Sequence, residues 1–145
     1  MLQYDNTIIT NLSSSMLNII VKTVPDTSQR YDTVGDYYID ENGKRVFSIS
    51  SMEDWRYEFL ILIHELVEST LCKERDISGD VIDAFDFAFE NARKPEDKKS
   101  EPGNDPSAPY FKEHQFASKI ERMIADELGV DWHIYETACE RLTRN

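Results

Sequence analysis

The sequence WRYEFLILIHELVESTLC, at residues 55–72, decides the fold predicted for this chain. Plotted at about 100° per residue, its apolar side chains cover nearly the whole circumference of a helix, which is typical of a helix buried on most sides. Its polar side chains gather in one wedge, where His64 and Glu68 lie one turn apart and Glu65 lies beside them. Unpaired charges in such a helix cost on the order of several kcal/mol each. A bound metal ion is the first candidate for compensating them.

Length and composition predict one soluble globular domain spanning residues 1–145, with 40% hydrophobic and 30% charged residues. The net charge of −12 argues against binding of the nucleic-acid backbone, because phosphate contacts need clustered Lys and Arg. The sequence also has no Gly-rich phosphate loop before a helix. It has neither a signal-like N-terminus nor a run of about 18 apolar residues, so we expect a cytoplasmic protein that is not membrane-bound.

The segment before this helix predicts a small antiparallel sheet of about three strands. Residues 1–15 are interpreted as an arm or a short edge strand, and residues 16–24 alternate at the strand period. Asn42-Gly43 then separates two further alternating runs, which is the strongest short-range signal for a hairpin. A two-residue turn at this point pairs Glu41 with Lys44, Asp40 with Arg45, and Ile39 with Val46.

Four helices are predicted to follow the sheet, which makes the fold class α+β. They lie at about residues 52–74, 78–93, 109–128 and 131–142. In the second helix one face is acidic, and we expect it to face water; it consists of Asp80, Asp83, Asp86 and Glu90. Residues 94–109 hold four prolines and predict an exposed loop, of a length often found in functional lids.

The motif His64-Glu65-Leu66-Val67-Glu68 places two metal-ligand types at i and i+4 on one helix face, so that both can hold one ion. Glu65 is offset sideways, in the position of a general base. A third ligand must come from elsewhere, and only His114 and His133 remain as imidazoles. His114 is better placed, at the edge of an amphipathic helix. The set His64, Glu68 and His114 has the composition of an open catalytic zinc site, although another divalent metal would also fit.

Two further residues of the third helix region are candidates for the same site. Glu121 lies two turns after His114, and it either hydrogen-bonds His114 or ligates the metal in its place. Tyr110 lies one turn before His114, and its hydroxyl is a candidate for stabilising a developing oxyanion.

The helix that carries this motif resembles the active-site helix of the zincin metallopeptidases, which also place a small sheet before the metal helix. This resemblance covers about a dozen residues and implies a zinc-dependent hydrolase, with peptides as one substrate class. The sequence departs from the family pattern at Glu68, where zincins have a second His.

A wider resemblance is to a group of small uncharacterised proteins from bacteria and bacteriophages. It is carried by five motifs between residues 33 and 132: TVGD, DWRYEFLILIHELVE, EPGNDPSAPY, EHQFASKIE and LGVDW. This likeness implies no activity.

Other interpretations compete with a zinc hydrolase. In one of them, His64 and Glu68 hydrogen-bond each other in a core without metal, and the protein is a non-enzymatic interaction protein. His133 would then have a structural role, and Tyr110 would be a core residue. In another interpretation, two pairs of acids resemble the magnesium ligands of all-α nucleoside triphosphate pyrophosphohydrolases. These pairs are Glu65 with Glu68 and Asp80 with Asp83. Two features speak against that enzyme class: the predicted sheet, and an acidic face that lies opposite Phe85 and Phe89.

Overall fold

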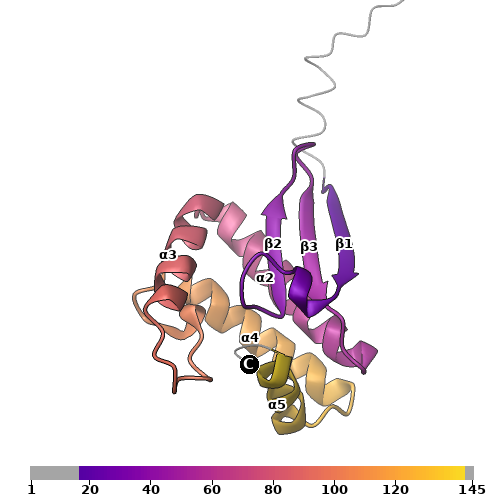
Figure 1. Cartoon of the computed structure of the whole chain (residues 1–145). Helices are drawn as coiled ribbons and strands as arrows, with labels where there is room; N and C mark the ends of the chain where they lie inside the picture. Colours follow the sequence, from indigo (N-terminus) through magenta and orange to yellow (C-terminus); the bar gives the residue numbers. More distant parts are fainter. Residues whose placement is uncertain (1–16, 143–145) are drawn as a thin grey trace, which may run out of the picture.

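The computed structural model describes residues 17–142 (Figure 1). Three strands come first, and they are β1 (Ile19–Val24), β2 (Gly35–Ile39) and β3 (Arg45–Ser50). Four α-helices follow: α2 (Trp55–Glu74), α3 (Gly79–Asn91), α4 (Phe111–Glu127) and α5 (Trp132–Leu142). Two short 3-10 helices, η1 (Asp26–Ser28) and η2 (Pro102–Asn104), lie in the connecting loops. The α+β fold class is therefore confirmed, whereas the arm or strand predicted for residues 1–15 lies outside the described residues.

The sheet is mixed, which corrects the prediction of an antiparallel sheet. Its strand order is β1-β3-β2, with β2 antiparallel to β3 and β1 parallel to β3. The hairpin signal fixes only the β2–β3 pair. The loop after β1 carries the chain past the position that β3 later fills, so β2 forms at the far edge and β1 pairs in parallel with the central strand.

The hairpin turn has three residues instead of two. Ile39 lies opposite Arg45, so the predicted pairing is wrong by one position. Asp40 explains the difference, because its carboxylate accepts hydrogen bonds from the backbone N–H groups of Asn42 and Lys44, both at 2.9 Å. This local bonding favours a longer turn, and Gly43 supplies the positive φ of 75° that such a turn requires.

Helix α2 packs against β2 and β3 on one side and against α4 on the other, as Figure 1 shows. Leu60 is completely buried, and it belongs to a core with Ile49, Ile61, Ala125, Val130 and Tyr135. The helix is less enclosed than predicted, since Trp55 is 67% exposed and Phe59 is 38% exposed. Its inner face is the one that carries the polar wedge.

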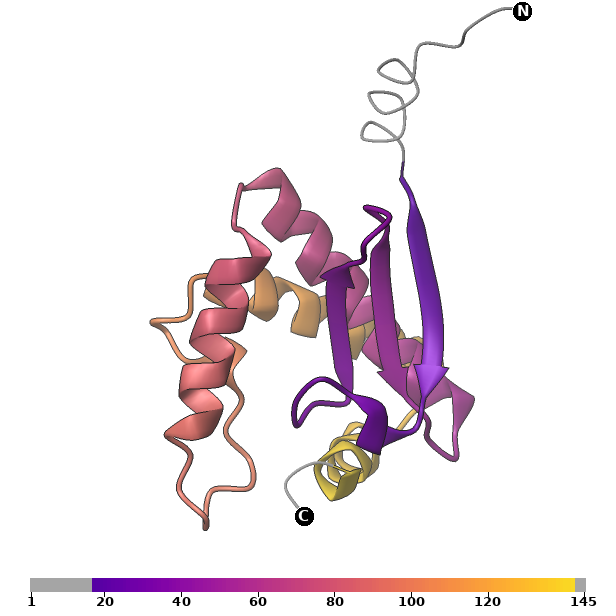
Figure 2. The same ribbon diagram turned by 45° about the horizontal axis from the view of Figure 1, so that its top comes forward.

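Helix α3 stands apart from the strands of the sheet (Figure 2). Ser78 caps it by accepting a hydrogen bond from the N–H of Val81 at 3.3 Å. The prediction that its acidic face meets water is wrong for Asp86, which is only 5% exposed, whereas Phe87 is 40% exposed. The reason is a second small core of Cys72, Ile82, Ala108 and Tyr110, because residues 82 and 86 lie one turn apart and face it together.

The Pro-rich loop is largely exposed as predicted, but Gly103 and Ala108 within it are buried. Its η2 segment packs against α3 and α4. Helix α4 ends before Gly129, whose φ is 68°, and Asp131 then caps α5 by accepting a hydrogen bond from the N–H of Ile134 at 2.9 Å. Among residues 17–142, no helix is long and apolar enough to cross a bilayer.

Candidate metal centre

Three buried side chains from two helices point at one place. His64 and Glu68 come from α2, and His114 comes from α4. The Nε2 atom of His64 lies 3.1 Å from Oε2 of Glu68 and 3.1 Å from Nδ1 of His114, which in turn lies 2.8 Å from Oε2 of Glu68. The structure therefore confirms that the predicted residues converge, and together they could hold a metal ion. In the described part of the chain, this is the one group of three or more potential ligands that converges in this way.

The triangle of donor atoms has nearly the size that a zinc ion requires. Tetrahedral ligands at about 2.0–2.1 Å from zinc lie about 3.4 Å from one another. The observed separations of 2.8 to 3.1 Å are a few tenths of an ångström shorter. Small side-chain rotations would therefore be enough to open the triangle around an ion.

Glu121 orients His64 from outside the triangle. The Nδ1–H of His64 donates to Oε1 of Glu121 at 2.8 Å, and the hydroxyl of Tyr135 donates to Oε2 of the same carboxylate at 2.8 Å. With Nδ1 protonated, a neutral His64 presents the lone pair of Nε2 to the centre of the triangle. Glu121 contacts His64 instead of His114, in the arrangement by which carboxylates orient histidine ligands of metals.

The loop segment before α4 positions His114. A Cβ atom at Gly103 would lie 2.4 Å from Cγ and Nδ1 of the imidazole, so the backbone of η2 packs directly on the ring. On its outer side, Nε2 of His114 lies 3.6 Å from a carboxylate oxygen of Glu101. Sequence reasoning missed both residues, although the motif EPGNDPSAPY contains them. A glycine three residues before a proline-rich turn carries no signal of a contact with a distant ring.

Glu68 gives the centre its negative charge. Burial alone would raise its pKa, but the hydrogen bonds from His114 and His64 outweigh burial and lower the pKa to about 2. Burial likewise opposes protonation of His114, yet the neighbouring carboxylates of Glu101 and Glu68 raise its pKa to about 9. The pKa of His64 also lies well above its usual value, because Glu121 and Glu68 outweigh burial. In the metal-free protein, protons therefore supply the positive charge that a metal ion would bring.

Glu65 lies outside the triangle and faces strand β2. A Cβ atom at Gly35 would lie 3.0 Å from Oε1 of Glu65 and 2.6 Å from Cγ2 of Ile61, so the strand passes close over the carboxylate. Burial, followed by the charge of Glu68, raises the pKa of Glu65 to about 8. The carboxylate thus lies beside the centre without belonging to its group of converging ligand atoms.

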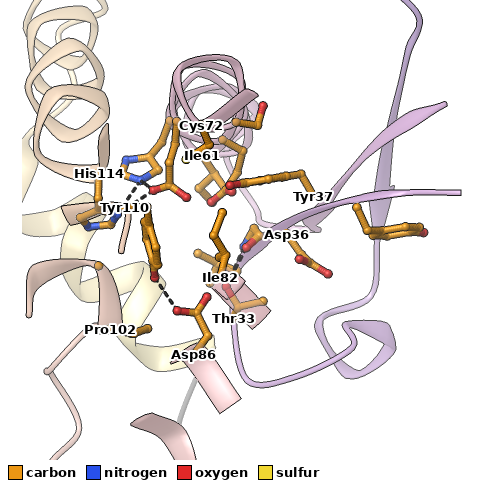
Figure 3. A pocket seen from close by; sticks show the side chains of 18 of the residues that line it. Thr33, Asp36, Tyr37, Ile61, Cys72, Ile82, Asp86, Pro102, Tyr110 and His114 are labelled. Atoms are coloured by element: carbon orange, nitrogen blue, oxygen red, sulfur yellow. Dashed lines mark hydrogen bonds and ion pairs between the residues drawn. The ribbon is translucent and has the colours of Figure 1, made fainter. Parts of the chain in front are cut away.

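Tyr110 is buried, and its hydroxyl is engaged away from the centre. It donates to Oδ1 of Asp86 at 2.5 Å, while its ring packs edge-on against His114 with centroids 6.1 Å apart (Figure 3). Burial raises the pKa of Asp86 to about 7, although the hydrogen bond from Tyr110 opposes this shift. The sequence signal that could have placed Asp86 here is its spacing of four from Ile82 on the inner side of α3.

A pocket of about 1170 Å³ connects these groups. The sheet edge at β2, helices α2, α3 and α4, and the η2 segment all contribute to its wall. His64, Glu65, Glu68, Asp86, Tyr110 and His114 line it. Figure 3 shows His114, Tyr110 and Asp86 following one another along this wall.

The remaining predicted residues lie elsewhere. His133 is exposed in the first turn of α5. Asp80 is exposed, and Asp83 forms an ion pair with Arg30 at 3.4 Å, so neither belongs to the convergent group. Comparisons of the chain with protein-family models, with curated proteins and with solved structures found no match.

Proposed function

We propose that this protein is a zincin-like, metal-dependent hydrolase in which His64, Glu68 and His114 hold one divalent metal ion, with zinc as the first candidate. The observation that carries the proposal is the convergence of two imidazole nitrogens and one carboxylate oxygen within 3.1 Å of one another. Zinc binds this ligand set in catalytic sites and leaves a fourth position open. Manganese and iron are the next candidates, since imidazole and carboxylate also suit them.

A zinc ion at this place would supply Lewis acidity, which polarises a carbonyl group and lowers the pKa of a coordinated water. Glu65 is the proposed general base, since its carboxylate lies beside the ligands and lines the same pocket. Its pKa of about 8 belongs to the protein without metal, and a nearby cation lowers the pKa of a carboxyl group. Glu65 would then be ionised at neutral pH and able to accept a proton.

Tyr110 is proposed as a donor to a developing negative charge. Its ring already packs against His114 at the pocket wall. For this role its hydroxyl must exchange Asp86 for the substrate, so the role depends on a rotation of the side chain.

A non-enzymatic interaction protein is the competing proposal, because the hydrogen bonds among His64, Glu68, His114 and Glu121 also form a connected network without metal. Replacing His64 and Glu68 together by Leu distinguishes the two. A purely structural network predicts that the double variant folds with similar or higher stability, and that the wild type contains no stoichiometric metal.

The deciding experiment is elemental analysis of protein purified without chelator, together with a peptidase assay on unfolded polypeptide. About one metal ion per chain is expected in the wild type. His64→Ala and His114→Ala should both lose the ion, whereas Glu65→Gln should keep it and lose only hydrolysis. No binding after reconstitution with zinc, manganese and iron would refute the proposal.

A further inference from the structure

The buried carboxylates of this protein differ in how their charge is balanced. Five carboxylate residues are buried among the described residues, while Glu65, beside the metal centre, is half-buried. Four of them contact a basic group: Asp36 binds Arg30, Glu113 binds Arg75, and Glu68 and Glu121 bind His64. Asp86 is the fifth, and within residues 17–142 its hydrogen-bond partner is the neutral hydroxyl of Tyr110. Asp86 is therefore the one buried carboxylate of this set without a basic partner.

In the described part of the chain, no neighbouring arginine forms an ion pair with Asp86. Two arginines contact α3, and both are engaged elsewhere: Arg93 binds Glu90 at 2.7 Å, and the guanidinium of Arg30 binds Asp36 through two hydrogen bonds, of 2.6 and 2.9 Å. The remaining contact of Arg30 with α3 is to Asp83, at 3.4 Å. The Asp86 carboxylate thus lines the pocket with no cation of the described residues in hydrogen-bond contact, although the residue is only 5% exposed. The imidazole of His114, against the ring of Tyr110, lowers the pKa of Asp86 by its charge, but burial outweighs this effect.

An uncompensated buried carboxylate is costly in its ionised form. Burial accordingly raises the pKa of Asp86 to about 7, in spite of the hydrogen bond from Tyr110. A positively charged ligand group that entered the pocket would remove this cost by providing the missing partner. The stabilisation would be large because water is mostly excluded from the carboxylate.

The position of Asp86 relative to the metal centre indicates what kind of ligand would fit. Tyr110 lies between them, with its ring against His114 and its hydroxyl on Asp86 (Figure 3). The two sites are therefore separated by about one tyrosine side chain along the same pocket. Ile61, Ile82 and Tyr31 also line this pocket and offer apolar contacts.

We propose that Asp86 binds a positively charged group of the substrate, an ammonium or guanidinium at the end of an alkyl arm, while the bond to be hydrolysed lies at the metal centre. The substrate class is then a molecule with a lysine-like or arginine-like side chain. The assignment of the hydrolysed bond rests on the proposed function above. The cation site itself does not, since it consists of Asp86 and the pocket wall.

Calorimetric titration with butylguanidinium tests the cation site directly, on full-length protein treated with chelator so that the metal plays no part. The wild type should bind butylguanidinium at least about tenfold more tightly than butylurea, its neutral isostere. Asp86→Asn keeps the size of the side chain and an acceptor for Tyr110, and it should weaken binding of butylguanidinium at least about tenfold. Asp80→Asn is the matched control, because it removes the same charge from an exposed position on the same helix.

Equal binding of butylguanidinium and butylurea would overturn the proposal, as would an Asp86→Asn variant that binds within about twofold of the wild type. An equal loss in Asp80→Asn would overturn it too, by showing only a dependence on net charge. If Asp86→Asn fails to fold, amide chemical-shift changes in the wild type locate the cation, and they should centre on residues 85–87 and 110. Cation binding by a protein without metal or hydrolysis would refute the proposed function alone, whereas a metal-dependent hydrolase without charge preference would refute this inference alone.

Discussion

His64 and His114 bring two imidazole nitrogens within 3.1 Å of each other, although 50 positions separate them in the chain. One ring comes from α2 and the other from α4, and each has its other nitrogen turned outward to a carboxylate, Glu121 for His64 and Glu101 for His114. The same carboxylate oxygen of Glu68 lies 3.1 Å from the His64 nitrogen and 2.8 Å from the His114 nitrogen, so it holds the two rings together. The predictions below follow from how the surrounding residues hold this pair.

Gly103→Ala should weaken zinc binding at least about tenfold, because the new methyl group would lie 2.4 Å from the His114 ring and displace Nδ1 from the triangle. Gly79→Ala is the control, since nothing lies within 4 Å of a Cβ atom at that position. Zinc affinity can be measured for both variants by competition with a chromophoric chelator. Unchanged affinity in Gly103→Ala would show that His114 is not a ligand in its present orientation.

Glu121→Gln should lower zinc affinity about 10- to 100-fold without abolishing binding, because the neutral amide orients His64 but no longer increases its basicity. Tyr135→Phe removes one hydrogen bond from the same carboxylate and should act in the same direction more weakly. The same competition titration measures both. A complete loss of metal in Glu121→Gln, equal to that in His64→Ala, would instead identify Glu121 as a ligand.

Asp86→Asn should change how stability depends on pH. Asp86 has a pKa of about 7 in the folded chain and about 3.9 when unfolded, so the folded state binds this proton more tightly. Its contribution to stability is therefore present below about pH 4 and is lost as the pH rises to about 7, with a slope of at most about 1.4 kcal/mol per pH unit.

Urea unfolding of chelator-treated protein at about pH 5 and about pH 7 checks this expectation. The free energy of unfolding of the wild type, relative to that of Asp86→Asn, should fall between these two values. Asp80→Asn, at an exposed position, should show the same dependence of the free energy of unfolding on pH as the wild type. A constant difference between wild type and Asp86→Asn would mean that Asp86 is ionised throughout.

Leu60→Ala should destabilise the protein by about 2–5 kcal/mol, because Leu60 is completely buried between the sheet and α4 and its removal leaves a cavity. Phe59→Ala, at the neighbouring position, should cost far less, since Phe59 is 38% exposed. Urea unfolding measures both differences. An equal loss of stability in Leu60→Ala and Phe59→Ala would show that α2 is enclosed on both sides, as its composition alone suggested.

The sequence by itself determined the helix of α2 and the placement of His64 and Glu68 on one face of it, since spacing along one helix fixes which side chains share a face. It also indicated His114 as the third residue, because few imidazoles were available. The α+β class followed from the hairpin signal and the helical periods. These features depend on contacts between residues close in the chain, or on the small number of histidines in it.

Tertiary structure alone decided the features that join distant segments. The parallel pairing of β1 with β3 depends on which edge the hairpin occupies, and no local signal records that choice. Asp86 faces the pocket because the core around Tyr110 orients α3, although its helix pattern suggested an exposed acid. Gly103 lies on His114 only because η2 crosses the ring, and Glu121 meets His64 instead of His114 because α4 crosses α2 at that point. Spacing within a helix states which residues share a face, whereas the packing of helices against one another decides what that face meets.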